Sequence, residues 1–303
     1  MKILVSGSSG FIGKELVNFL KTFGNEVIRL IRHREDHPLD AIMWNPESGI
    51  DDTAALEEFD AVIHLAGENI AGGRWSEKKK ERILNSRVQG TLNLTKALLE
   101  LKKPPRVFIC SSAIGFYGNR GDMICTEETS SGNGFLADVC RRWEEASALA
   151  RSRGIRTINL RTGLVLSAQG GALAKMLIPF KLGLGGVLGS GRQYVSWIAM
   201  EDLLRIVGYI LTNDVFEGPV NAVSPNPVTN AELTKTFGKI LKRPTFFSMP
   251  ASLLRLILGK EMADEFLLSS TRVEPMKLKH NGYAFLYPDL KLALRHYLRK
   301  EQC

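Results

Sequence analysis

Short hydrophobic runs alternate along the chain with longer segments whose hydrophobic residues recur every three or four positions. The short runs predict buried strands at residues 2–6, 26–31, 60–66, 106–111 and 155–160. The longer segments predict helices at residues 12–22, 88–101 and 135–153. Apolar strands that alternate with helices are typical of a parallel sheet covered on both faces. We therefore expect an α/β fold with a doubly wound parallel sheet of the Rossmann type.

The pattern changes after about residue 165, where glycines punctuate a stretch that we interpret as loops. Beyond it we expect a helix over 201–212, a strand over 219–223 and a helix from Thr229, which has the capping-box spacing with Glu232. Residues 250–303 are expected to be helical. This change predicts a Rossmann domain of residues 1–168, with a returning segment of about 193–224. Segments of 169–303 would form a smaller, mostly helical substrate domain.

Three glycines, Gly7, Gly10 and Gly13, lie between the first predicted strand and the first predicted helix. In a dinucleotide-binding turn, the first glycine allows the tight turn, the second lets the backbone approach a pyrophosphate, and the third lets helix and strand pack closely. The free N–H groups at the start of the helix bind phosphate. We therefore predict that Gly7, Gly10, Phe11, Ile12 and Gly13 contact a dinucleotide.

Arg32 occupies the position that distinguishes NAD from NADP. Rossmann folds that bind NAD place an Asp or Glu about 20 residues beyond the glycines, and Arg32 follows Gly13 by 19 positions. A guanidinium matches a 2′-phosphate bidentately. Arg32 therefore predicts NADP(H). The alternative is an exposed loop arginine beside Glu35 and Asp36.

The Gly-x-x-Gly-x-x-Gly spacing resembles the short-chain dehydrogenase/reductase superfamily, specifically its extended, nucleotide-sugar-epimerase-like branch. Further segments resemble this family in the same order along the chain, namely residues 60–67, 85–93, 110–118, 195–202 and 218–223. Residues 69–75 and 128–144 and the C-terminal helical region resemble an atypical epimerase-family subgroup, some of whose members are labelled cell-division inhibitors. The resemblance implies an NADP(H) site that also includes Leu65, Ala66, Gly67, Glu68, Asn69, Arg87, Ser111 and Ser112, with residues 60–67 lining the ribose on the nicotinamide side.

The same resemblance implies a catalytic Tyr whose pKa is lowered by a Lys four positions later, and this pair is missing. Counted back from Glu144, the Tyr position falls on Leu136 and the Lys position on Cys140. A shift of one residue gives Phe135 and Val139, which supply neither group. A phenol with a pKa near 10 is a poor base at neutral pH without such help. The catalytic residues are therefore left unassigned.

Several side chains near the predicted site are open to two interpretations. Ser112, with Ala113 as the other register, is a catalytic hydroxyl or a ribose ligand, and Tyr117 is a proton donor or part of the pocket wall. Cys140 is a reactive thiol or an inert one. Arg87 and Arg161 each bind a phosphate or an anionic substrate, or are surface charges. The remaining candidates are Glu68 and Asn69 as ribose or substrate ligands, His64 as a core residue, and Gly183–Gly191 with Arg192 as an anion-binding loop.

Composition narrows the functional classes. The 303 residues are 44% hydrophobic and 24% charged, as in ordinary globular proteins. The chain has no apolar run long enough to span a membrane, and it starts with too short an apolar run for a signal peptide. The cysteines, at 110, 125, 140 and 303, lack metal-site spacing, so we expect buried thiols, no bound metal and a cytoplasmic location.

The net charge of +8 is unevenly spread, since residues 151–200 hold seven Lys or Arg residues and no acid. The one dense basic run, Lys78–Lys80, is flanked by Glu77 and Glu81 and predicts a solvated helix face. A small anionic ligand fits this pattern better than nucleic acid.

Two functions follow from these observations. The first is an NADP(H)-dependent oxidoreductase or epimerase that acts on a small polar carbonyl or nucleotide-sugar substrate. The second is a non-catalytic NADP(H)-binding protein that reports the redox state of the cofactor. The missing Tyr/Lys pair favours the second function, and the glycine-rich stretch of the substrate domain favours the first. Neither the substrate nor the oligomeric state follows from the sequence.

Overall fold

A seven-stranded parallel sheet forms the centre of the computed structural model, which describes residues 1–32, 40–50 and 52–299. The strand order is β12-β7-β5-β4-β1-β2-β3. These strands are β1 (Lys2–Ser6), β2 (Glu26–Ile31), β3 (Ala41–Met43), β4 (Ala61–His64), β5 (Val107–Ala113), β7 (Arg156–Thr162) and β12 (Gly218–Ala222). The predicted doubly wound Rossmann sheet is confirmed.

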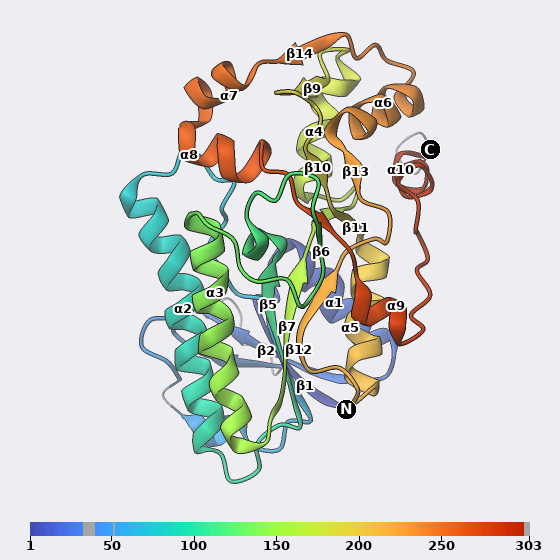
Figure 1. Cartoon of the computed structure of the whole chain (residues 1–303). Helices are drawn as coiled ribbons and strands as arrows, with labels where there is room; N and C mark the ends of the chain where they lie inside the picture. The colour runs from blue at the N-terminus through green and yellow to red at the C-terminus, as the bar shows by residue number, and fades with distance from the viewer. Residues whose placement is uncertain (33–39, 51, 300–303) are drawn as a thin grey trace.

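Helices cover both faces of this sheet (Figure 1). On one face, α1 (Phe11–Thr22) and α5 (Met200–Thr212) enclose a core that includes Leu16 and Ile206. On the other face, α2 (Glu77–Glu100) and α3 (Phe135–Ala148) enclose a core that includes Leu98 and Phe108. The strand order reverses at β1, which lies between β2 and β4. Ligands of such sheets bind beyond the carboxyl ends of the strands at this switch point.

Two of the predicted helices have different bounds in the structure. The helix expected over 88–101 begins at Glu77, because the Ser76 side chain accepts a hydrogen bond from the backbone N–H of Lys79 at 3.2 Å and caps it. The helix expected over 135–153 is α-helical only to Ala148 and continues as a 3₁₀ segment, Leu149–Arg153.

The C-terminal half contributes a second lobe with its own core, which includes Trp197, Phe237 and Leu294. The stretch interpreted as loops contains α4 (Gly171–Lys181) and β9 (Gly186–Leu188), which pairs with β14 (Phe247–Met249). A Cβ on Gly186 would lie 1.8 Å from the carbonyl oxygen of Phe247, so this glycine serves strand pairing. The other elements of the lobe are β8 (Leu164–Leu166), β10 (Tyr194–Val195), β11 (Trp197–Ala199), β13 (Val228–Thr229) and α6 (Asn230–Leu241).

The capping box at the start of α6 is confirmed. Thr229 Oγ1 accepts from the backbone N–H of Glu232 at 3.2 Å, and Glu232 Oε2 accepts from the backbone N–H of Thr229 at 2.8 Å. Downstream, the structure has short helices with extended links between them rather than continuous helix. They are α7 (Ala251–Leu258), α8 (Lys260–Met262), a π-helical turn (Ala263–Leu267), α9 (Met276–His280) and α10 (Leu290–Arg299), with β15 (Arg272–Val273) pairing β6 (Ile124–Cys125).

The predicted division at residue 168 stays a prediction, although β12 does return to the edge of the sheet after α4 and α5. Within the described ranges, no helix combines the length and apolar character needed to cross a membrane.

Candidate functional site

The turn between β1 and α1 has the geometry of a phosphate loop. Gly7 has φ +68°, and its carbonyl oxygen accepts from the backbone N–H of Gly10 at 3.0 Å. A Cβ on Gly13 would lie 2.1 Å from that same oxygen, so only glycine fits there. No side chain caps the start of α1, and its first turn holds no acid. The first N–H groups of this helix therefore face the turn without a side-chain partner.

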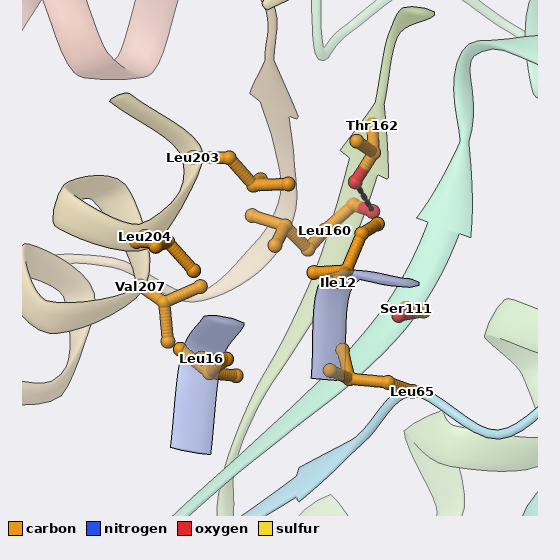
Figure 2. Close-up of a pocket in the computed structure, with 9 residues that line it drawn as sticks. All are labelled: Ile12, Leu16, Leu65, Ser111, Leu160, Thr162, Leu203, Leu204 and Val207. Carbon is orange, nitrogen blue, oxygen red and sulfur yellow. Dashed lines mark hydrogen bonds between the residues drawn. The ribbon is translucent and has the colours of Figure 1, made fainter. Parts of the chain in front are cut away.

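The predicted cofactor residues of neighbouring strands meet at this turn. A Cβ on Gly7 would lie 2.7 Å from the carbonyl carbon of Leu65 and 2.8 Å from the backbone nitrogen of Ala66. Ile12, Leu65 and Ser111 line one narrow apolar hollow between α1 and α5 (Figure 2). Residues far apart in the sequence are thus brought together at the carboxyl ends of β1, β4 and β5.

Phe11 joins the phosphate loop to the second lobe. Its ring packs so closely on Gly170 and Gly171 that a Cβ on Gly171 would lie 2.7 Å from Phe11 Cε1. The start of α4 therefore lies directly against the phosphate loop.

Arg32 is exposed at the end of β2, and Glu35 and Asp36 lie outside the described residues. The pKa of the Glu68 carboxyl is lowered mainly by its hydrogen bond to Lys79, with smaller contributions from Arg82 and Arg32. The charge of Arg32 therefore acts on the same edge of the sheet as Glu68.

Glu68 and Asn69 already have partners within the chain. Glu68 Oε1 accepts from Lys79 Nζ at 2.6 Å, and Asn69 Oδ1 accepts from the backbone N–H of Ala71 at 2.9 Å. Just before them, Gly67 faces Arg87, whose Cζ would lie 3.3 Å from a Cβ on that glycine. Arg87 Nη1 donates to the Glu68 carbonyl oxygen at 2.9 Å. These contacts hold the link from β4 to α2 in place.

Ser112 belongs to a buried polar cluster between β5, β7 and α3. Its hydroxyl donates to Glu144 Oε1 at 2.7 Å. Arg161 donates to both carboxylate oxygens of Glu144, from Nε and Nη2, at 2.8 Å each. Arg161 Nη1 donates to Tyr117 Oη at 2.9 Å, and Tyr117 Oη donates to Asn221 Oδ1 at 2.7 Å. Every polar group of this chain of contacts has a partner.

This cluster decides between the alternatives for two residues. Arg161 is 3% exposed and stacks 3.5 Å from the centroid of the Phe116 ring, so it is neither a surface charge nor a free anion-binding group. Both expectations for Arg161 are wrong, because Glu144 on α3 takes its charge-assisted hydrogen bonds. Burial raises the pKa of Tyr117 to about 12, and its fully buried hydroxyl already donates to Asn221, so it is not a free proton donor.

The side chains of Leu136 and Cys140 both point toward Gly115, which follows β5. A Cβ on Gly115 would lie 3.4 Å from Leu136 Cβ and 3.8 Å from Cys140 Sγ. Burial raises the pKa of the Cys140 thiol to about 11, so it stays protonated at neutral pH and is not a reactive nucleophile. Cys110 and Cys125 are also buried and unpaired, as expected, and Cys303 lies outside the described residues.

Sequence reasoning missed Glu265, which caps α3 from 130 residues away. Its carboxylate accepts from the backbone N–H groups of Phe135 at 2.9 Å and Leu136 at 2.8 Å. Gly134, immediately before the helix, leaves the room, since a Cβ there would lie 2.8 Å from the Glu265 carboxyl carbon. The one signal in the sequence was that Gly134, which has no side chain to cap a helix, stands immediately before α3.

A polar hollow lies between the second lobe and the segment after β5. Arg192 and Asp122 line it, with Asn119, Gly121, Ser190, Gln193, Leu268 and Ser270. Nearby in the chain, Arg272 lies 4.9 Å from the centroid of the Tyr194 ring, and its buried Nε has no hydrogen-bond partner. Arg192 and Arg272 form no ion pair in the described part of the chain. The described residues contain no group of His, Cys, Asp and Glu side chains that could hold a metal ion.

Comparisons with known proteins agree with this architecture. A model described as the NAD dependent epimerase/dehydratase family matches residues 3–222, and one described as a domain of unknown function matches residues 249–297. An epimerase family protein of Mycobacterium bovis is 41% identical over 292 residues, which cover 96% of each chain.

Solved structures show the same likeness. The human epimerase family protein SDR39U1, crystallised with NADPH, is 32% identical with a TM-score of 0.89 over 99% of each chain. A nucleoside-diphosphate sugar epimerase from Corynebacterium glutamicum is 36% identical with a TM-score of 0.81, over 98% of this chain and 58% of that one. A Thermus thermophilus UDP-glucose 4-epimerase, at 19% identity and a TM-score of 0.76, shares the fold.

Proposed function

The chain belongs to the NAD dependent epimerase/dehydratase family, and on that premise we propose that it binds NADP(H) and acts as an oxidoreductase or epimerase on a small, polar, anionic carbonyl or nucleotide-sugar substrate. The observation that carries this proposal is the uncapped start of α1 behind Gly7, Gly10 and Gly13. The N–H groups there would hold the pyrophosphate. The presence of NADPH in the human relative supports the choice of cofactor.

Gly10→Val is expected to weaken NADPH binding at least about 100-fold while the protein still folds. A Cβ at this position would lie 3.1 Å from the Gly7 carbonyl oxygen, so the loop need shift only slightly, but a branched side chain would occupy the approach of the pyrophosphate. Calorimetric titration with NADPH measures the loss, and circular dichroism checks the fold. Asn18→Val is the matched control, because it adds the same branched side chain at an exposed position of α1 away from the loop. Undiminished affinity in Gly10→Val would contradict the phosphate-loop assignment.

Arg32→Asp is expected to reverse the cofactor preference from NADP(H) to NAD(H). The guanidinium would pair with the 2′-phosphate, whereas a carboxylate would accept a hydrogen bond from the 2′-hydroxyl and repel the phosphate. The dissociation constants of both cofactors measure the change, and Arg82→Asp, also exposed at this edge, is the control. If the preference does not move, Arg32 does not select the cofactor.

The anionic part of the substrate would bind at Arg192, which lines the polar hollow, and at Arg272, whose buried Nε has no hydrogen-bond partner. The remaining cofactor contacts would come from Phe11, Ile12, Gly67 and Ser111, which surround the carboxyl ends of β1, β4 and β5. The glycines of 183–191 allow close packing around β9. Arg192, rather than the backbone of that loop, would therefore bind the anion.

The alternative function, a non-catalytic NADP(H)-binding redox sensor, is favoured by Leu136 and Cys140. If these side chains stand where the family has its Tyr and Lys, no proton donor of the usual kind faces the nicotinamide. A panel of aldehydes, ketones and nucleotide sugars, followed by loss of NADPH absorbance, separates the two functions. Turnover of any substrate supports an enzyme, and tight NADPH binding without turnover supports a sensor.

A further inference from the structure

Arg87 of α2 is a cation packed between the end of β4 and α3. Its Nη1 donates to the carbonyl oxygens of Glu68 at 2.9 Å and Ile83 at 3.3 Å. Its Cζ lies 5.1 Å from the centroid of the Trp143 ring, on the same helix as Cys140. On the other side it faces Gly67. The guanidinium is therefore fixed where β4, α2 and α3 meet.

The charge of Arg87 is not neutralised within the described part of the chain. No carboxylate forms an ion pair with it, and its Nε and Nη2 have no hydrogen-bond partner there. Glu68, whose carbonyl oxygen Arg87 contacts, has its carboxylate paired with Lys79 at 2.6 Å. Burial lowers the pKa of Arg87, yet an arginine remains protonated at neutral pH. Arg87 is partly exposed, so a ligand can reach its free donors.

The position of Arg87 matches the role that the missing lysine leaves open. Counted back from Glu144, Cys140 occupies the Lys position. Burial raises the pKa of its thiol to about 11, and the charge of Arg87 acts in the opposite direction. The charge of Arg87 therefore reaches the Cys140 thiol. Gly67, which Arg87 touches, ends the segment that would line the ribose on the nicotinamide side.

We propose that Arg87 replaces the missing lysine as the cation beside the nicotinamide and makes the site bind NADPH more tightly than NADP⁺. This inference rests on the proposed function. The oxidised nicotinamide ring carries a positive charge and the reduced ring carries none, so a nearby unpaired guanidinium opposes the oxidised form alone. At an effective dielectric constant of about 20, a unit charge several ångströms away changes a binding constant by roughly ten- to a hundredfold.

The test compares the dissociation constants of NADP⁺ and NADPH, measured by calorimetry, in the wild type and three variants. In Arg87→Met the ratio of the NADP⁺ constant to the NADPH constant is expected to fall about tenfold. For a two-electron couple this change corresponds to about 30 mV in the potential of the bound cofactor. Arg87→Lys keeps the charge and is expected to keep most of the ratio. Arg82→Met, on the same helix with a side chain that is 59% exposed, is expected to leave the ratio unchanged.

The outcomes separate this inference from the proposed function. If the wild type binds neither form, the proposed function fails and the inference falls with it. If both forms bind and Arg87→Met has the wild-type ratio, only the inference is overturned. If Arg87→Met weakens both forms equally, Arg87 supports the fold of the site without selecting the redox state, which also overturns the inference. Thermal unfolding of each variant shows that the compared proteins are folded.

Discussion

Arg161→Met is expected to lower the free energy of unfolding by about 3–5 kcal/mol, the usual cost of removing one partner from a buried ion pair. The variant would leave the Glu144 carboxylate, whose side chain is 11% exposed, with only the Ser112 hydroxyl as a donor. It would also remove the stacking on Phe116 and the hydrogen bond to Tyr117. Urea unfolding followed by tryptophan fluorescence measures the change.

Two further variants make this result specific. Arg141→Met lies on the exposed face of α3, the helix that carries Glu144. It breaks an exposed i,i+4 contact of 3.1 Å with Glu145 and is expected to cost less than about 1 kcal/mol. Combining Arg161→Met with Glu144→Leu removes both buried charges and is expected to recover much of the stability lost in the single variant. If Arg161→Met costs no more than Arg141→Met, the cluster does not hold the sheet to α3.

The position of this cluster bears on how the site works. Glu144 of α3 accepts the hydrogen bond of the Ser112 hydroxyl, whereas Ser111 lines the hollow beside Ile12 and Leu65 (Figure 2). Successive residues of a strand point to opposite faces, so the two serines cannot serve the same face. Of the two, Ser111 lines the hollow that Ile12 of the phosphate loop also lines.

The features that the sequence predicted well are set by local constraints. The phosphate loop requires glycine at Gly7 and Gly13 for reasons of backbone geometry, and this requirement is visible in the local sequence. The buried strands were predicted because a parallel sheet demands continuous apolar runs. The capping box at Thr229 was predicted because both of its partners lie within one turn.

The features that were missed depend on contacts between distant parts of the chain. Glu265 caps α3 across 130 residues, and no local pattern connects it with Phe135. Arg161 was expected to be exposed or ligand-binding because its partner, Glu144, lies on another element. The helix α4 was missed because glycines such as Gly170 and Gly171 are typical of loops. In the structure these two glycines instead allow the close contact with the Phe11 ring.

Acidification is expected to destabilise the protein through His64, whose complete burial confirms the prediction of a core histidine. The side chain is fully buried on β4, with Nδ1 2.6 Å from Ser6 Oγ, and Nε2 has no hydrogen-bond partner. Burial lowers its pKa to about 4, from an ordinary value of 6.5. The ring packs edge-on against Trp44, 5.8 Å between centroids, so there is no room for a counter-ion on that side.

Because the unfolded chain binds a proton at His64 more readily than the folded protein does, stability is lost as the pH falls from 6.5 toward 4. The loss attributable to His64 is expected to reach about 3 kcal/mol, at about 1.4 kcal/mol for each pH unit. Urea unfolding at pH 7, 6, 5 and 4.5 measures this dependence of stability on pH. The variant His64→Asn keeps an acceptor for Ser6 but does not titrate. It is expected to flatten the dependence and to lower the stability at pH 7. His280→Asn, at an exposed position at the end of α9, is expected to retain the slope of the wild type. Equal slopes in the wild type and His64→Asn would mean that His64 accepts a proton in the folded protein, and that the end of β4 beside Leu65 opens to water at mildly acidic pH.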